Sequence, residues 1–315
     1  MTRRGVFAGL ASAATALSTA CSPLTAFNTL APRDPAERLG RALAYGPLSR
    51  QRLDVYAPPA ATRASAGAGA SAPVLVFFYG GSWNSGRRQD YAFVGQALAA
   101  RGFVTVIPDY RLFPQVRYPE FLKDGAAAVR WVREHAAAYG GDPDRLVLAG
   151  HSAGAYNAMM LALDPEFLTA AGVDPRIVKA VAGLSGPYYF LPFDVPSTRD
   201  AFGACPDPPA TQPLNHVSAA SPPAFLAHGG RDALVQPRNA TALGKALARA
   251  GRPVEVKIYP GLGHADTVLA LSRLFRGRAP VLSDMAAFLH AHTQGPVARP
   301  EGVNVSAAQV SVSAN

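Results

Sequence analysis

The pentapeptide Gly150-His151-Ser152-Ala153-Gly154 carries the residues with the clearest chemical potential in this sequence. It follows the apolar run 146–149 and precedes a stretch, 153–163, that is predicted to be helical. A tight turn between strand and helix needs its two glycines because side chains there would collide, and it lifts the serine oxygen above the sheet. We therefore predict that Ser152 is a nucleophile. The alternative is a structural serine in an ordinary turn.

A serine nucleophile needs a base, and His264 is the best placed of the seven histidines. It stands in the glycine-rich loop 261–264, directly after the predicted strand 254–259, where a late loop can place it over the serine. The alternative is a lone histidine on a surface loop. The other six lie inside the turn, on predicted helices, at a strand end or in an irregular stretch: His151, His135, His290, His292, His228 and His216.

The histidine in turn needs a carboxylate that fixes its tautomer and stabilises the imidazolium. Eight acidic residues lie between Ser152 and His264, and only Asp232 stands in a loop directly after a predicted buried strand, 224–227. We predict that Asp232 is this carboxylate. The alternative is an aspartate in a surface turn.

Negative charge on a reacting oxygen needs two backbone amides that approach it closely. The segment Tyr79-Gly80-Gly81-Ser82-Trp83 follows the predicted strand 74–79, and its glycines allow such an approach. We expect Gly81 or Ser82 to supply one amide and Ala153 the other, with Gly80 shaping the loop. An ordinary glycine turn is the alternative. Trp83 would either wall the substrate site or pack beneath the loop, and the sequence leaves both options open.

The elements that must position these residues alternate between apolar strands and helices. Strands are predicted at 52–56, 74–79, 103–107, 146–149, 178–184, 224–227 and 254–259, and the main helices at 90–100, 121–139, 153–163, 240–250 and 283–292, the last with Ser283 as its cap. This order predicts an α/β fold with a mostly parallel sheet and helices on both faces. One rhythm without a linker indicates a single domain, 51–293.

The remaining segments have weaker patterns. Residues 22–50 form a proline-punctuated lead-in with a possible short helix around 36–43, and 58–72 are predicted to be a flexible loop rich in alanine, glycine and serine. Residues 294–315 are a polar, small-residue tail that we expect to be disordered.

The first 21 residues have the pattern of an export signal, with Arg3 and Arg4 before an apolar stretch too short to anchor in a bilayer. Small residues before Cys21 resemble a bacterial lipoprotein processing site, with Ser18 where that pattern has Leu. We expect an exported protein, either periplasmic or membrane-anchored through lipid on Cys21. The alternative is ordinary cleavage near Ala20, which would leave Cys21 as a plain thiol.

Composition excludes several classes of protein. Hydrophobic residues make up 49% of the 315, and the only long uncharged apolar run is at the N-terminus, so neither a fully disordered chain nor a polytopic membrane protein fits. Two cysteines exclude a disulfide scaffold. The net charge of +9 comes from scattered arginines, which is not the concentrated basic surface of a nucleic-acid binder.

With these motifs in this order, the chain resembles the α/β-hydrolase superfamily. Within it, the sequence is most similar to the carboxylesterase-like group of BD-FAE-type esterases, kynurenine formamidases and hormone-sensitive-lipase-like enzymes. The resemblance extends over about 52–292 and rests on segments 79–83, 108–112, 150–154, 184–188, 228–232 and 263–264.

The resemblance implies a Ser152-His264-Asp232 triad and an oxyanion loop at Gly80, Gly81 and Ser82. It implies a structural role for Arg111, a substrate pocket bordered by Ser185 and Tyr188 with His151 and Trp83 nearby, and no metal or cofactor. The family has histidine where this chain has Tyr79; that histidine braces the oxyanion loop, and the tyrosine hydroxyl could replace it.

The expected reaction is a two-step acyl transfer on a small-molecule ester, with short-chain or aryl esters favoured because the only sizeable insertion, 190–221, is proline-rich rather than an apolar lid. An arylformamidase or amidase would use the same triad. This hypothesis ranks second because a formamidase of tryptophan breakdown would be cytoplasmic, whereas this protein is expected to be exported. A third hypothesis is a non-catalytic binding protein on the same fold. This hypothesis predicts the loss of a triad residue. The oligomeric state stays open.

Overall fold

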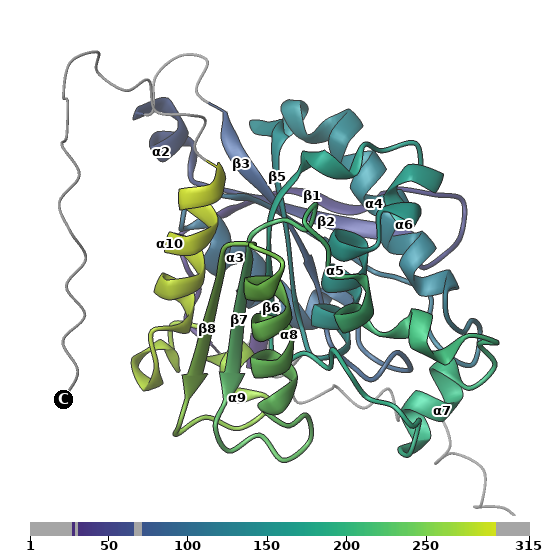
Figure 1. Cartoon of the computed structure of the whole chain (residues 1–315). Helices are drawn as coiled ribbons and strands as arrows, with labels where there is room; N and C mark the ends of the chain where they lie inside the picture. Colours follow the sequence, from purple (N-terminus) through teal and green to yellow (C-terminus); the bar gives the residue numbers. More distant parts are fainter. Residues whose placement is uncertain (1–26, 29–30, 66–70, 294–315) are drawn as a thin grey trace, which may run out of the picture.

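The computed structural model describes residues 27–28, 31–65 and 71–293, which form one eight-stranded sheet with helices on both faces (Figure 1). The strand order is β1-β2-β4-β3-β5-β6-β7-β8. The first two strands are antiparallel to their neighbours, and the other six run parallel. The strands are β1 (Glu37–Ala44), β2 (Arg52–Ala57), β3 (Ala72–Phe78), β4 (Val104–Pro108), β5 (Gly141–His151), β6 (Val178–Leu184), β7 (Ala224–Gly229) and β8 (Val254–Tyr259). The α/β fold predicted from the sequence is confirmed.

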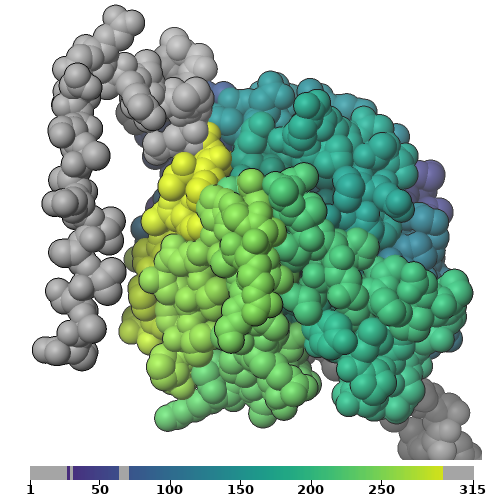
Figure 2. All heavy atoms as spheres, in the orientation of Figure 1, coloured from purple at the N-terminus to yellow at the C-terminus, as the bar shows by residue number. Residues whose placement is uncertain are grey.

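The helices pack in two layers against this sheet. On one face, α3 (Ala92–Ala99) and α10 (Val281–Thr293) contact each other, and the opposite face carries α4 (Glu120–His135), α5 (Ala153–Leu163), α6 (Pro165–Ala170) and α8 (Arg238–Arg249). Helix α7 (Pro196–Phe202) lies in the long connection after β6, and this segment stands out at the lower right of Figures 1 and 2. Each central strand is thus covered on both faces, as expected for parallel strands with continuous apolar sequences.

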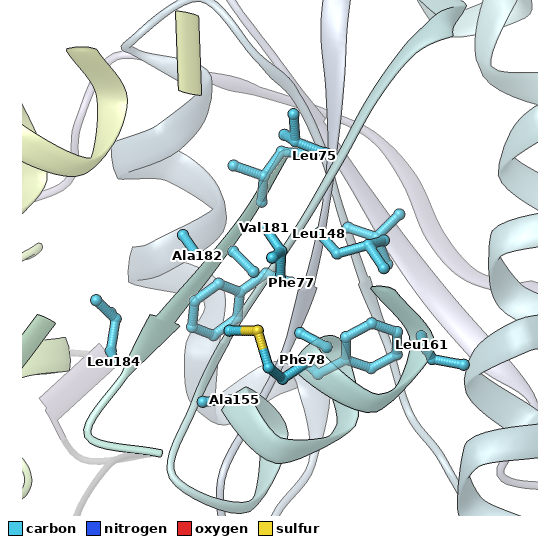
Figure 3. Close-up of a cluster of buried hydrophobic side chains, with 14 of the residues drawn as sticks. Leu75, Phe77, Phe78, Leu148, Ala155, Leu161, Val181, Ala182 and Leu184 are labelled. Atoms are coloured by element: carbon cyan, nitrogen blue, oxygen red, sulfur yellow. The ribbon is translucent and has the colours of Figure 1, made fainter. Parts of the chain in front are cut away.

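Part of the core surrounds the strand that leads into the Ser152 turn. Side chains from three neighbouring strands and from α5 pack together there, and all are fully buried: Leu75, Phe77, Phe78, Leu148, Ala155, Leu161, Val181, Ala182 and Leu184 (Figure 3). Burying one such leucine or phenylalanine stabilises the fold by about 2 kcal/mol. The turn is therefore supported by fully buried core residues on the strands and helix around it.

Three local predictions are wrong. The helix expected around 36–43 is strand β1, because pairing with the free edge of β2 outweighs the helical spacing of its apolar residues. The predicted loop at 58–72 contains the short helix α2 (Ala60–Ser65). Helix α10 begins two residues before Ser283, whose hydroxyl donates to the carbonyl of Pro280 instead of capping the helix.

The two ends of the chain carry predictions that stay untested. The export signal 1–21, the lipidation site Cys21 and the tail 294–315 lie outside the described residues. Strand β1 belongs to the sheet, so part of the lead-in 22–50 is integral to the fold. No helix among the described residues is long and apolar enough to cross a membrane.

Candidate active site

Ser152 occupies a strained turn at the end of β5. Its φ and ψ are 54° and −125°, which a residue with a side chain adopts only when its surroundings enforce them. The chain passes so closely that a Cβ on Gly154 would lie 2.1 Å from the carbonyl oxygen of Phe78, and a Cβ on Gly150 would lie 2.2 Å from that of Gly154. This geometry matches the tight turn predicted from the pentapeptide.

The structure brings Ser152, His264 and Asp232 together, although they come from loops after β5, β8 and β7. The Nε2 atom of His264 lies 2.8 Å from the Oγ atom of Ser152, and its Nδ1 atom lies 2.8 Å from an Asp232 carboxylate oxygen. These loops all follow the carboxyl ends of parallel strands, marked by the arrowheads of β7 and β8 near α9 (Asp266–Leu269) in Figure 1. Such an array lets the histidine accept the serine proton while donating to the carboxylate.

The carboxylate of Asp232 is held in its ionised form. Burial alone raises the pKa, but hydrogen bonds from His228 and His264 and from the Val235 amide outweigh it and hold the pKa of Asp232 well below its usual range. One oxygen, Oδ1, accepts from the amides of Leu234 (3.0 Å) and Val235 (2.9 Å), so the other faces the histidines. An ionised carboxylate only accepts hydrogen bonds, which requires the proton of His264 on Nδ1 and leaves Nε2 free as a base.

A second histidine touches this carboxylate. His228, at the end of β7, is fully buried, and its Nε2 atom lies 3.2 Å from Asp232 Oδ2 and 2.7 Å from the carbonyl oxygen of Val235. A carbonyl accepts only, so Nε2 carries the proton and donates. The sequence pattern placed His228 at a strand end and did not predict this contact. Its position four residues before Asp232 at a strand end was the available signal.

His151 lies among protein groups beside the catalytic residues, and its predicted pocket role stays a prediction. It is buried, and its Nε2–H donates to the backbone carbonyl of His264 at 3.1 Å. Its Nδ1 faces the Tyr91 hydroxyl at 3.5 Å, and the same hydroxyl accepts from the Gly80 amide at 3.2 Å. Burial, together with the nearby His264, lowers the pKa of His151 to about 3. A neutral His151 therefore links the loop that carries His264 to the oxyanion loop.

This buried histidine predicts acid sensitivity of the fold. The folded pKa of His151 lies below the unfolded value of about 6.5, so the unfolded chain binds more protons and stability falls as pH drops through this window. Between pH 7 and pH 4 the loss from this residue is about 3 kcal/mol. In urea unfolding at both pH values, His151→Gln should lose correspondingly less than the wild type. The exposed control His135→Gln should behave as wild type, and equal losses in all three proteins would contradict the assignment.

The oxyanion loop has an unusual backbone. Gly81, Ser82 and Trp83 all have positive φ, at 133°, 52° and 59°. In the part of the chain that the structure describes, the amides of Gly81 and Ser82 have no protein acceptor, and Ala153 begins α5, where amides lack intrahelical partners. A Cβ on Gly80 would lie 3.0 Å from the Cβ of Ser152, so the loop lies directly against the serine. The three predicted amides thus gather beside the serine.

The other predicted pocket residues are buried in contacts with protein. Trp83 packs beneath the loop, with its Nε1–H donating to the side-chain oxygen of Asn157 at 3.1 Å. Ser185 is fully buried and its hydroxyl lies 3.0 Å from that of Thr267. Tyr188 is also buried, with its amide held by Asn239 at 2.8 Å. Trp83 thus takes the second of its two predicted positions, and the predicted place of Ser185 and Tyr188 at the border of a substrate pocket stays a prediction.

Arg111 has the structural role that the resemblance implied. Its guanidinium donates to both carboxylate oxygens of Asp124, at 2.8 to 3.1 Å, and one of its terminal nitrogens also reaches Glu120 at 3.2 Å. Among the described residues, no group of three or more histidine, cysteine, aspartate or glutamate side chains could hold a metal ion.

The sheet, the serine on its strand-to-helix turn and the histidine and aspartate bonded to it define a serine hydrolase of the α/β-hydrolase class. The chain belongs to the BD-FAE family, whose model matches residues 53–247, more than half of its length. Relatives of similar sequence are esterases.

Two curated relatives show the similarity in sequence. The chain is 30% identical over 252 residues to the probable isoprenylcysteine alpha-carbonyl methylesterase ICMEL1 of Arabidopsis thaliana, covering 73% of this chain and 51% of that protein. It is 30% identical over 276 residues to the esterase LipQ of Mycobacterium tuberculosis, covering 80% and 62%. The chain thus spans only about half to two-thirds of the length of these two relatives.

The fold is also that of known esterase structures. The apo form of Thermogutta terrifontis esterase 2 superposes with a TM-score of 0.67 at 24% sequence identity, covering 84% of this chain and 98% of that one. The truncated carbohydrate esterase from gut microbiota gives a TM-score of 0.65 at 18% identity, covering 83% and 97%. At these identities the likeness supports the fold alone.

Proposed function

We propose that this protein hydrolyses short-chain carboxylic esters through a covalent acyl-enzyme on Ser152. The observation that carries the proposal is the position of His264, 2.8 Å from both the Ser152 hydroxyl and the Asp232 carboxylate. A hydroxyl and an imidazole at this separation can exchange a proton without rearrangement.

Acylation begins when His264 takes the hydroxyl proton and Ser152 Oγ attacks the ester carbonyl carbon. The carbonyl oxygen becomes an oxyanion, which the amides of Gly81 or Ser82 and of Ala153 stabilise. The imidazolium, paired with ionised Asp232, then gives its proton to the leaving alcohol as the carbon–oxygen bond breaks. The product is an ester between Ser152 and the acyl group.

Deacylation repeats these steps with water. His264 takes a proton from a water molecule, whose oxygen attacks the acyl carbon, and the same amides hold the second oxyanion. The proton on His264 returns to Ser152 Oγ as the acyl bond breaks, which releases the carboxylic acid. The low pKa of Asp232 keeps the carboxylate charged beside the imidazolium in both halves of the reaction.

Short acyl groups are favoured because aromatic side chains occupy the space beside the oxyanion loop. The Trp83 ring packs against those of Phe202 and Tyr156, with centroids 4.7 and 5.3 Å away, and Phe190 adds to the cluster. The long connection after β6 thus fills this region and is not an open apolar lid. The T. terrifontis esterase of the same fold was solved with butyrate and with propionate bound, which supports short acyl chains as first substrates to test.

A substrate panel tests the proposal. Initial rates would be measured with p-nitrophenyl acetate, butyrate and octanoate and with an N-formyl aromatic amine, using Ser152→Ala protein from the same preparation as the blank. We expect the highest kcat/KM for acetate or butyrate, with octanoate at least tenfold lower. Preferred hydrolysis of the formyl amine would replace the esterase with a formamidase on the same triad. No hydrolysis of any compound by well-folded protein would overturn the proposal.

A further inference from the structure

Arg50 is a cation whose described partners all belong to the oxyanion loop or to the strand end beside it. It stands in the connection between β1 and β2, just outside the region that matches the family model. Its Nη2 atom donates to the Tyr79 hydroxyl and to the Gly86 carbonyl, both at 2.8 Å, and its Nε atom donates to the Tyr110 carbonyl at 2.8 Å. Among the described residues it forms no ion pair with a carboxylate.

These contacts join the two ends of the loop 79–86. At one end, the buried Tyr79 ring stacks on that of Tyr110 with centroids 4.7 Å apart, and the Tyr110 hydroxyl donates to the Tyr79 carbonyl at 2.8 Å. At the other end, a Cβ on Gly86 would lie 2.7 Å from the Gly80 carbonyl oxygen, so the ends touch. One guanidinium nitrogen bridges them through Tyr79 and Gly86.

The loop needs such external support because its backbone is strained. Three consecutive positive φ angles, at Gly81, Ser82 and Trp83, include two at residues with side chains. Strained backbone persists only where contacts with the rest of the protein hold it. The middle of the loop has its own anchor, since the Trp83 carbonyl accepts from the Phe113 amide at 2.8 Å and its ring nitrogen donates to Asn157. Tyr110 and Tyr91 hold the first end, and Arg50 joins that end to Gly86 at the other.

We propose that Arg50, acting with Tyr79, is a positioning residue that holds the amides of the oxyanion loop where negative charge develops on the substrate oxygen. The inference rests on the proposed acyl transfer and adds a residue to its machinery. Arginine suits this task because its rigid fork can donate to several carbonyl and hydroxyl oxygens at once, whereas a lysine ammonium has no such fixed geometry. The phenol of Tyr79 supplies the acceptor that the guanidinium needs at this position.

The proposal predicts a specific kinetic defect. Amides that contact the oxyanion act in the transition state more than in the bound substrate, so their displacement lowers kcat and leaves KM nearly unchanged. We expect Arg50→Met to lower kcat for p-nitrophenyl butyrate 10- to 100-fold with KM within twofold. The Ki of a short-chain trifluoromethyl ketone, which forms the oxyanion on Ser152, should rise by the same factor. Arg50→Lys should have kcat and Ki values between those of the wild type and of Arg50→Met.

Coupling with Tyr79 gives a second readout. Tyr79→Phe should lower kcat less than Arg50→Met does, and it should have little further effect when Arg50 is already methionine, because both act through one contact. Arg41→Met is the matched control, since Arg41 is an exposed arginine on neighbouring β1. It should match the wild type in kcat, KM and Ki.

Labelling of Ser152 by a fluorophosphonate probe separates this inference from the proposed substrate. The labelling rate needs the same triad and amides but no ester substrate, and it should fall in Arg50→Met as kcat does. Labelling without ester hydrolysis in the wild type would overturn the esterase while still testing Arg50. Unchanged kcat and labelling in Arg50→Met, or a lower kcat with an unchanged ketone Ki, would overturn the positioning role. Loss of activity that tracks only a smaller folded fraction, judged by thermal unfolding, would do the same.

Discussion

Replacing Ser152 by alanine is expected to lower kcat for p-nitrophenyl butyrate by about 10⁵-fold. Without Oγ no acyl-enzyme forms, and only a weak water reaction aided by the oxyanion amides would remain. That loss corresponds to about 7 kcal/mol of activation free energy. Thermal stability should change little, because alanine and serine bear the same Cβ at the strained φ of 54°. Rates and unfolding curves of the two proteins measure both effects.

The control is a serine remote from the site. Ser283→Ala on α10 removes a hydroxyl that donates to the Pro280 carbonyl, and it should keep wild-type rates. A second check is the mass of the peptide that contains residue 152 after treatment with a phosphonylating reagent. This mass should increase in the wild type and in Ser283→Ala but not in Ser152→Ala. Activity in Ser152→Ala within tenfold of the wild type would remove Ser152 from the mechanism.

Asp232→Asn should lower kcat by about 10⁴-fold, although asparagine has nearly the same shape. The Oδ1 position accepts from the amides of Leu234 and Val235, so the asparagine oxygen must stay there and its NH2 must face His264. His264 Nδ1 would then accept instead of donating, which moves its proton to Nε2, the atom that should take the serine proton. His228 Nε2–H also faces that NH2 and adds a repulsive contact.

The measurement is kcat and KM at neutral pH, with nitrogen-bound proton resonances of His264 reporting the tautomer. Asp194→Asn is the matched control, because Asp194 is an exposed aspartate in the connection after β6. It should match the wild type in rate and in its histidine spectrum. If Asp232→Asn kept more than a tenth of the wild-type kcat, another group would have to orient His264.

Local signals were enough to predict the fold class and the meeting of three distant residues. Each of Ser152, Asp232 and His264 stands in a turn or loop after a predicted strand. The carboxyl ends of parallel strands share one edge of a sheet, so their convergence follows from strand order. A strand with a continuous apolar sequence must also lie inside the sheet, where helices cover both of its faces. These constraints come from a few neighbouring residues and can be read without tertiary contacts.

Side-chain direction could not be read in the same way. Whether His151 faces substrate or the carbonyl of His264 depends on how the β8 loop crosses the turn, and this is set by residues more than a hundred positions away. Likewise, Arg50 carries no local pattern, and its role depends on Tyr79 and Gly86 in a loop that only the finished sheet brings beside it. Strand β1 was missed because its partner β2, not its own composition, makes it a strand.

Strand β1 also affects how this protein behaves at high concentration. It is the outermost strand on its side of the sheet. By pairing with β2 it covers the backbone edge of that buried, apolar strand, which would otherwise be free to pair with another chain. Its own edge is a poor template, since it bears Glu37, Arg38 and Arg41, and its pairing with β2 shifts register on either side of Gly40. A version of the protein shortened to begin near residue 53 would expose a flat apolar edge and aggregate as the sheets of separate molecules join.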